Sequence, residues 1–234
     1  MQSIPLTSLA LTFIPVFGVI GVLYYWNLGY QKALYAVIRM LVQLLLIGYV
    51  LIYLFDAERP WPVLAVLLVM VVASSWISLN ALEAKSRSLY LNVCFSILLG
   101  GGSVLWLVSQ LVLTLEPWYL PRYMIPLAGM IFANTMTGIS LAAERFQSEF
   151  RRDRDYELAR NTAYRAAMIP VVNSLFAVGL VSLPGMMTGQ ILSGVEPIVA
   201  ARYQIMVMCM IFGSTGISTA CFLMLLKNKS DLTQ

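Results

Sequence analysis

The chain has 234 residues, of which 60% are apolar and only 11% are charged. Soluble domains are about 45–50% apolar and about 25% charged, so this composition, with a mean hydropathy of +0.81, excludes a soluble globular protein. The sequence contains no histidine, which excludes imidazole bases and histidine-ligated zinc sites. The net charge of +4 does not indicate a nucleic-acid partner, because the basic residues of a membrane protein collect on its cytoplasmic loops.

The apolar residues are gathered into long segments. A transmembrane helix needs about 20 apolar residues to cross a hydrocarbon core about 30 Å thick. Seven segments of this kind are present, at residues 4–26, 33–55, 61–79, 89–113, 123–143, 168–192 and 203–226. No charge precedes Lys32, so the first segment lacks the basic region of a cleavable signal peptide and is expected to remain as a helix. The pattern predicts an all-α, polytopic membrane helix bundle with about seven transmembrane helices, forming one integral-membrane domain over residues 1–234.

Lysine and arginine are distributed unevenly between alternate loops. If the N-terminus lies outside, the cytoplasmic loops hold twelve Lys and Arg residues, and the opposite loops hold three, Arg59, Arg122 and Arg202. Cytoplasmic loops retain positive charge, so this bias predicts an N-out, C-in orientation. That orientation needs an odd number of spans, which agrees with seven.

The charged residues concentrate between Glu144 and Ala167, which hold 11 of the 26 in the chain. Opposite charges recur there at helical spacing, so the segment 143–167 is predicted to form one charged cytosolic helix. Phe146 and Phe150 are four residues apart and begin a less polar stripe, which could dock on a partner or on the membrane surface. The simpler alternative is a solvated helix that only satisfies the positive-inside bias.

Polar residues inside the predicted spans are candidates for a translocation path. Arg39 and Gln43 share a face of the second span, where a guanidinium costs at least a few kcal/mol unless it snorkels, pairs or faces water. Snorkelling to the cytoplasmic headgroups is the plain alternative for Arg39. Asn134 and Asn173 are amides that join helices by hydrogen bonds as readily as they line a cavity.

The segment 168–192 is the most irregular. Proline removes a backbone donor and clashes with the preceding turn, and Gly185 follows Pro184 directly, so a break is expected near Pro184. Transporters use broken helices at substrate sites and gates, although a purely structural kink is equally compatible with the sequence. The thioethers at the break could suggest soft-metal ligands, but methionine is also ordinary core filler, and no metal site is identified. The candidate gate and path residues are therefore Arg39, Gln43, Asn134, Asn173, Pro184, Gly185, Met186, Met187 and Gln190.

Several kinds of chemistry lack the residues that they need. No Gly-x-x-x-x-Gly-Lys-Ser/Thr motif occurs, so the chain cannot hydrolyse ATP through a P-loop. All 11 acidic residues fall in loops, at span ends or in the cytosolic segment, which argues against a proton or sodium relay. Cys94, Cys209 and Cys221 lie singly in apolar runs, so neither a disulfide framework nor a thiolate cluster is indicated. We expect no enzymatic activity and no cofactor in this chain.

Several stretches of the sequence resemble the FetB family. The most specific is Val178-Gly-Leu-Val-Ser-Leu-Pro-Gly-Met-Met-Thr-Gly-Gln190, followed by Gly194-Val-Glu-Pro197 and Tyr203-Gln-Ile-Met206. Further matches are Arg39 with Gln43-Leu44 and Gly48-Tyr49-Val50-Leu51, Ile125-Pro126-Leu-Ala-Gly129-Met130 with Asn134, and Arg165-Ala-Ala-Met-Ile169-Pro170 with Asn173. The resemblance covers nearly the whole chain.

This family comprises permease subunits of a small ABC transporter associated with iron export, with plant relatives linked to aluminium tolerance. The resemblance implies two permease chains in the bacterial inner membrane and two ABC ATPase subunits, which bind ATP and Mg²⁺. It also implies that the cytosolic segment contacts the ATPase, with candidate coupling residues Arg151, Arg152, Tyr156, Glu157, Arg160, Tyr164 and Arg165.

The cytosolic segment departs from the family pattern. Relatives carry an acidic, Ala-rich stretch ending in Leu-Gly-Ala shortly before the residue that matches Arg165. This chain runs from Glu157-Leu158-Ala159 straight to Arg165, so its loop is shorter. Either coupling to the ATPase is made differently, or a piece of the loop is missing.

The sequence thus predicts the permease subunit of an ABC transporter that exports a metal ion, iron, or a related solute from the cytoplasm. The alternative is an ATP-independent metal-ion channel or facilitator. The substrate stays open, because iron favours carboxylate, imidazole or thiolate ligands and the spans offer amides, hydroxyls and thioethers instead.

Overall fold

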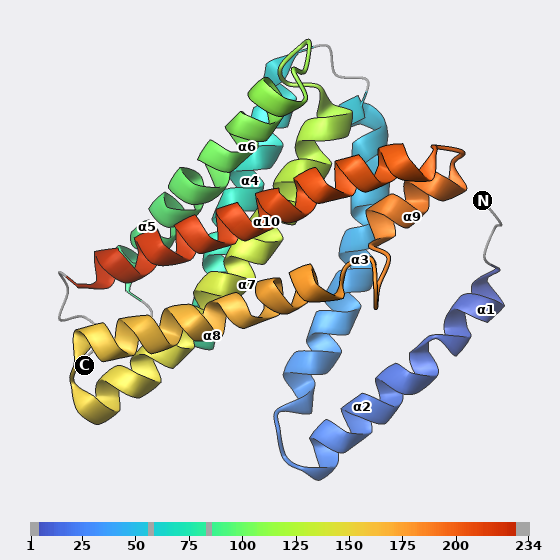
Figure 1. The fold of residues 1–234 in the computed structure, drawn as a ribbon. Helices are drawn as coiled ribbons and strands as arrows, with labels where there is room; N and C mark the ends of the chain where they lie inside the picture. Colours follow the sequence, from blue (N-terminus) through green and yellow to red (C-terminus); the bar gives the residue numbers. More distant parts are fainter. Residues whose placement is uncertain (1–4, 56–58, 83–85, 228–234) are drawn as a thin grey trace. The chain divides into compact units, whose positions relative to one another are not determined.

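The computed structural model describes residues 5–55, 59–82 and 86–227 (Figure 1). The chain divides into two compact units, Met1–Ala57 and Glu58–Gln234. Over the described residues the regular structure is helical, with a single isolated bridge between Val178 and Ser182. The all-α prediction is therefore confirmed, while the assignment of residues 1–234 to one domain stays a prediction.

Residues 5–55, the described part of the first unit, form three helices. Helix α1 (Leu6–Leu11) ends at Thr12, whose hydroxyl donates a hydrogen bond of 2.7 Å to the Leu9 carbonyl, and α2 (Phe13–Tyr25) follows at once. A turn containing Asn27 and Gly29, both with positive φ, leads into α3 (Tyr30–Phe55). Residues Thr7–Tyr25 and Tyr30–Phe55 are each long and apolar enough to cross a membrane, as the sequence predicts for the first two spans.

The second unit begins with α4 (Pro60–Ser78), which carries proline at its first turn and continues into the short 3₁₀ helix η1 (Leu79–Ala81). Residues Arg87–Val112 then form one helical span that includes two π-helical stretches. Its parts in chain order are α5 (Arg87–Ser96), η2 (Ile97–Gly102), α6 (Ser103–Leu107) and η3 (Val108–Val112).

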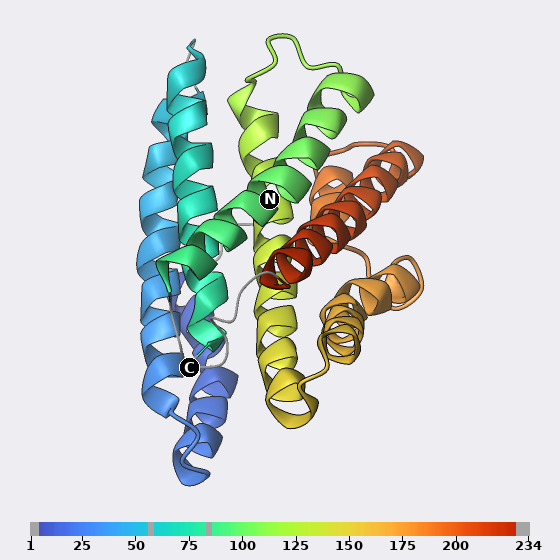
Figure 2. The same cartoon turned by 90° about the vertical axis from the view of Figure 1, so that its left-hand side faces the viewer.

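The remaining helices of the second unit are α7 (Pro121–Asp153), α8 (Tyr156–Ala177), α9 (Gly185–Leu192) and α10 (Pro197–Leu226). Figure 2 shows the C-terminal end of α7 turning back sharply into α8. Helix α10 packs against both of these helices and also against α5, η2 and α9. Helix α7 packs against α4, α8 and α10, so α7 and α10 together form the centre of the second unit.

Small residues let α10 approach its neighbours closely. A Cβ atom added to Gly100 of η2 would lie 2.5 Å from the backbone nitrogen of Ser218, and one added to Gly138 of α7 would lie 2.6 Å from Cγ2 of Thr215. Ser214, Thr215, Ser218 and Thr219 are fully buried along this face of α10. Such contacts are typical of helix packing in membranes, where small residues allow backbones to meet.

Six helices among the described residues are long and apolar enough to cross a membrane. They correspond to six of the seven predicted spans. The other predicted span, residues 168–192, is not a continuous helix but the C-terminal part of α8 followed by α9. The chain is thus a multi-pass membrane protein, and the count of seven and the N-out, C-in orientation stay predictions.

Candidate functional site

The charged segment 143–167 folds as a helical hairpin, which we call the cytosolic hairpin after the location that the sequence predicts for it. The prediction of one helix is wrong, because α7 continues through the segment to Asp153 and α8 begins at Tyr156. Arg154 adopts the left-handed conformation, with φ of 55°, and ends α7. Asp155 then caps α8, since its Oδ1 accepts hydrogen bonds from the backbone N–H groups of Glu157 and Leu158 at 2.8 and 3.2 Å.

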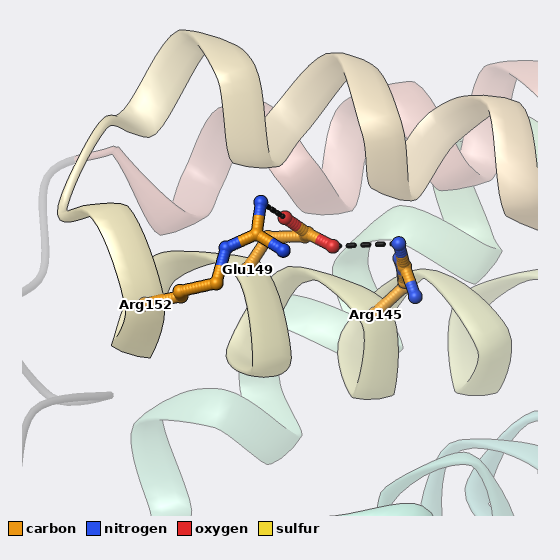
Figure 3. A network of polar contacts seen from close by, with 3 residues as sticks. All are labelled: Arg145, Glu149 and Arg152. Atoms are coloured by element: carbon orange, nitrogen blue, oxygen red, sulfur yellow. Dashed lines mark ion pairs between the residues drawn. The ribbon is translucent and has the colours of Figure 1, made fainter.

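A buried carboxylate holds two arginines on the α7 arm of the cytosolic hairpin (Figure 3). Glu149 Oε1 lies 2.6 Å from Arg145 Nη2, and its Oε2 lies 3.0 Å from Arg152 Nη2. The Glu149 side chain is 7% exposed, whereas the two arginines extend into solvent. Charge-assisted bonds of this kind fix the last turns of α7.

The aromatic stripe of the segment lies inside the hairpin. Phe146 is 2% exposed, its ring stacks on Phe150 at 5.5 Å, and the Tyr156 ring meets it edge-on at 5.9 Å. The sequence pattern suggests that the stripe beginning with Phe146 and Phe150 could dock on a partner. In the structure these two side chains instead pack between α7 and α8. Any partner therefore meets the turn and the charged outer surface of the hairpin instead.

Tyr156 also ties the hairpin to the last span. Its hydroxyl donates a hydrogen bond of 2.9 Å to the backbone carbonyl of Leu223 on α10. Burial raises the pKa of Tyr156 above its ordinary value of 10.0, although the nearby Arg160 opposes this, so the hydroxyl is protonated at neutral pH. The Arg160 guanidinium lies 5.6 Å from the centroid of the Tyr156 ring.

The predicted coupling residues all lie on the cytosolic hairpin, but in two groups. Arg151 and Arg152 are in the last turn of α7, next to the turn, and Tyr156 and Glu157 open α8. Farther along α8, three of the predicted residues line a pocket of about 410 Å³ between α8 and α10. Its lining residues are Arg160, Asn161, Tyr164, Arg165, Ala220, Leu223 and Met224.

The predicted break in the segment 168–192 is present. Helix α8 passes through Pro170 and ends at Ala177, and α9 begins directly after Pro184, which stands at its N-cap position. The connecting residues 178–184, which we call the broken-helix loop, are held by a hydrogen bond of 3.0 Å from Gly179 N–H to the Ser182 carbonyl. Gly179 has φ of 84°, a conformation that favours glycine.

The broken-helix loop borders a second cavity, of about 350 Å³, formed with α8, α9 and α10. Among the predicted path residues, Met187 lines it, together with Gln204, Met208 and Cys209 of α10. Gln204 was not predicted as a path residue, yet it is only 5% exposed and its Oε1 accepts no hydrogen bond among the described residues. A glutamine inside an apolar helix at this position is the signal that could have identified it.

The other predicted path residues are more dispersed. Pro184, Gly185, Met186 and Gln190 lie at or in α9 beside Met187. Asn134 donates its side-chain N–H to the Met130 carbonyl of its own helix at 2.8 Å, and Asn173 is exposed on α8, so neither lines the second cavity. Arg39 and Gln43 lie one turn apart on α3, in the first unit.

The described residues contain no group of three or more His, Cys, Asp or Glu side chains placed to hold a metal ion.

Comparison with known proteins places the chain in a family. Residues 6–230 match the model of an uncharacterised protein family, UPF0014. A UPF0014 membrane protein of Synechocystis sp. is 38% identical over 77% of this chain and 76% of its own length. The Escherichia coli protein named probable iron export permease protein FetB is 33% identical, covering 92% of this chain and 89% of its own length. The Arabidopsis thaliana protein ALUMINUM SENSITIVE 3 is 33% identical over 84% and 76%, respectively.

No solved structure is significantly similar to the chain. The family model covers nearly the whole sequence, and the relatives match most of their own length. The chain belongs to the UPF0014 family of membrane proteins.

Proposed function

We propose that the chain is the membrane permease subunit of an ABC transporter, powered by a separate ATPase. The observation that supports this most is the cytosolic hairpin, a rigid element continuous with the membrane helix α7 and with the apolar end of α8. A surface-only loop would not need a buried Glu149, a stacked aromatic core and a bond from Tyr156 to the last span. An element that transmits force between a partner and the membrane needs such rigidity.

The turn of the hairpin is the surface that we assign to the ATPase. Arg151, Arg152 and Arg154 alternate there with Asp153, Asp155 and Glu157, so the tip carries three cations and three acids. This densely charged tip suits a polar groove on the partner that offers both charges and hydrogen-bonding groups. Movement of the tip would reach α7 and α8 along their axes, and α10 through the Tyr156–Leu223 hydrogen bond.

The broken-helix loop is the element that we assign to the gate. The apolar part of α8, residues 168–177, is about 15 Å long, and the eight residues of α9 give about 12 Å, so neither crosses a core about 30 Å thick. The loop between them consequently falls inside the bilayer, where non-helical backbone is tolerated only against protein or water. A loop in that position is able to exchange contacts with protein for contacts with water when the transporter changes state.

Partner chains complete the proposal. The exposed fractions of Leu180 and Val181 at the tip of the broken-helix loop are 92% and 83%, which supports cover by a second permease chain in a homodimer. ATP and Mg²⁺ would bind to the ATPase. The name of the Escherichia coli relative supports export of iron or of a related solute across the bacterial inner membrane.

A pull-down of the tagged chain from its native membranes tests the proposal. The result expected is recovery of a P-loop ATPase whose ATP turnover changes when the permease is present. Recovery of no such ATPase, together with ATP turnover that is independent of the permease, would contradict the assignment.

The second candidate is a metal-ion facilitator that works without ATP. The observation that favours this candidate is the cavity lined by Met187 and Gln204. A passive path for ions also needs a polar side chain at membrane depth, and Gln204 supplies one. Ion flux that proceeds without nucleotide would support this candidate, and strict dependence on ATP would remove it.

A further inference from the structure

The pocket between α8 and α10 has one charged side and one apolar side. Arg160, Asn161, Tyr164 and Arg165 line it from α8, and Ala220, Leu223 and Met224 line it from α10. Its lining residues include two cations and no acid. The pocket therefore offers an anion two guanidinium groups next to a hydrocarbon wall.

The guanidinium of Arg160 is oriented by its neighbours Asn161 and Tyr156. Its Nε and Nη2 donate hydrogen bonds of 3.2 and 3.1 Å to Oδ1 of Asn161, and the guanidinium lies 5.6 Å from the centroid of the Tyr156 ring. These bonds use two of the five N–H donors of an arginine and leave three. A guanidinium fixed in this way loses little freedom when it binds a phosphate in bidentate fashion.

The α10 wall is shaped for an apolar chain. Ala220 and Met224 are four residues apart and share a face of the helix, with Leu223 beside them. Gly216, one turn earlier, leaves room for the Tyr164 hydroxyl, which would lie only 3.2 Å from an added Cβ. The wall thus leads from the guanidinium groups toward the membrane.

In the predicted orientation, Arg165 lies at the depth of the lipid headgroups, and Arg160 lies on their cytoplasmic side within reach of its long side chain. The sixth predicted span begins at Met168, so Arg165 is about 5 Å and Arg160 about 12 Å from its first residue along α8. The headgroup region on each side of a bilayer is about 5–8 Å thick, and long arginine side chains extend toward it. A phosphodiester at this level meets the guanidinium groups while its acyl chains follow α10.

We propose that this pocket binds the phosphate headgroup of an anionic phospholipid of the cytoplasmic leaflet. Basic pockets between membrane helices on the cytoplasmic side suit this ligand. An acidic segment of the ATPase fits less well, because the pocket lies more than one helical turn above the hairpin tip and one of its walls is entirely apolar. The proposal uses the C-in orientation but does not depend on the ATPase.

Lipid binding to the purified full-length chain tests this proposal. Native mass spectrometry would compare phosphatidylglycerol with phosphatidylcholine for the wild type, for the double variant Arg160→Gln/Arg165→Gln, and for Arg202→Gln. Arg202 is the matched control, because it is an exposed arginine near the opposite end of α10. We expect the double variant to bind phosphatidylglycerol at least about tenfold more weakly, since it loses two charge-assisted contacts. Arg202→Gln should bind it like the wild type.

Three outcomes would overturn the proposal. The first is unchanged phosphatidylglycerol binding by the double variant. The second is displacement of the lipid by millimolar inorganic phosphate, which would indicate a site for a soluble anion. The third is loss of ATPase capture by the double variant with lipid binding intact, which would indicate a protein contact.

A second variant guards against misfolding. Asn161→Ala removes the amide that orients Arg160 but leaves both charges, and it should weaken phosphatidylglycerol binding by a smaller factor than the double variant. If neither the wild type nor the variants capture an ATPase, the proposed transporter function fails while the lipid result still stands.

Discussion

The Tyr156 hydroxyl donates a 2.9 Å hydrogen bond to the backbone carbonyl of Leu223, joining residues 67 positions apart in the sequence. The bond links the start of α8 to the last turn of α10. Because Tyr156 also packs on Phe146 of α7, three helices meet at one side chain. This contact makes the cytosolic hairpin and the last span one mechanical unit.

Tyr156→Phe should weaken the connection between the cytosolic hairpin and α10 without removing the packing of the aromatic ring. The ring contacts with Phe146 persist, while the loss of one neutral hydrogen bond costs about 1 kcal/mol. We expect ATPase capture to be retained and ATP-driven transport to fall. Transport and capture are measured together in proteoliposomes, and unchanged transport would show that the bond carries no motion.

Asp155→Ala should destabilise the hairpin turn. The substitution removes the acceptor for the backbone N–H groups of Glu157 and Leu158, and loss of an N-cap costs about 1 kcal/mol. A lower Tm of the detergent-solubilised protein is expected, and Asp155→Asn should keep most of the stability because its amide oxygen still caps the helix. Equal Tm values for Asp155→Ala and the wild type would contradict the capping role.

Gly100→Ala should disrupt the packing of η2 against α10. The added Cβ would meet the Ser218 backbone, which cannot rotate away, so the helices must separate at a cost of about 1–3 kcal/mol or more. Gly102→Ala is the control, since no atom lies within 4 Å of its added Cβ. Folded yield and Tm are compared between the two variants, and we expect both to be lower for Gly100→Ala. Equal losses in both variants would contradict the close contact between Gly100 and Ser218.

Pro184→Leu should impair the proposed gate. Proline fixes the backbone that ends the broken-helix loop, and leucine allows other conformations there. We expect reduced transport with ATPase capture intact, because residue 184 lies outside the cytosolic hairpin. Transport equal to that of the wild type would remove the gate assignment.

Much of the fold follows from local pattern. Six predicted spans appear as helices, because a membrane helix satisfies all of its backbone groups within one segment and needs only apolar length. The break before α9 is also predictable, since Pro184 removes a backbone donor and clashes with the preceding turn, and Gly185 follows it directly.

Other features depend on contacts that local sequence does not encode. The hairpin turn uses Arg154 in the left-handed region, where glycine or asparagine is the usual signal, so the sequence pattern predicts a continuous helix. The Tyr156–Leu223 bond and the burial of Gln204 arise only when distant helices pack together. Periodicity marks a helix face but not the partner that covers it.

The measurement that tests the central claim most directly is solute flux in proteoliposomes containing the purified chain, with and without its ATPase and ATP. Iron would be the first solute, given the name of the Escherichia coli relative. The proposal of an ABC permease predicts flux only when both the ATPase and ATP are present. Flux at the same rate without nucleotide would contradict it.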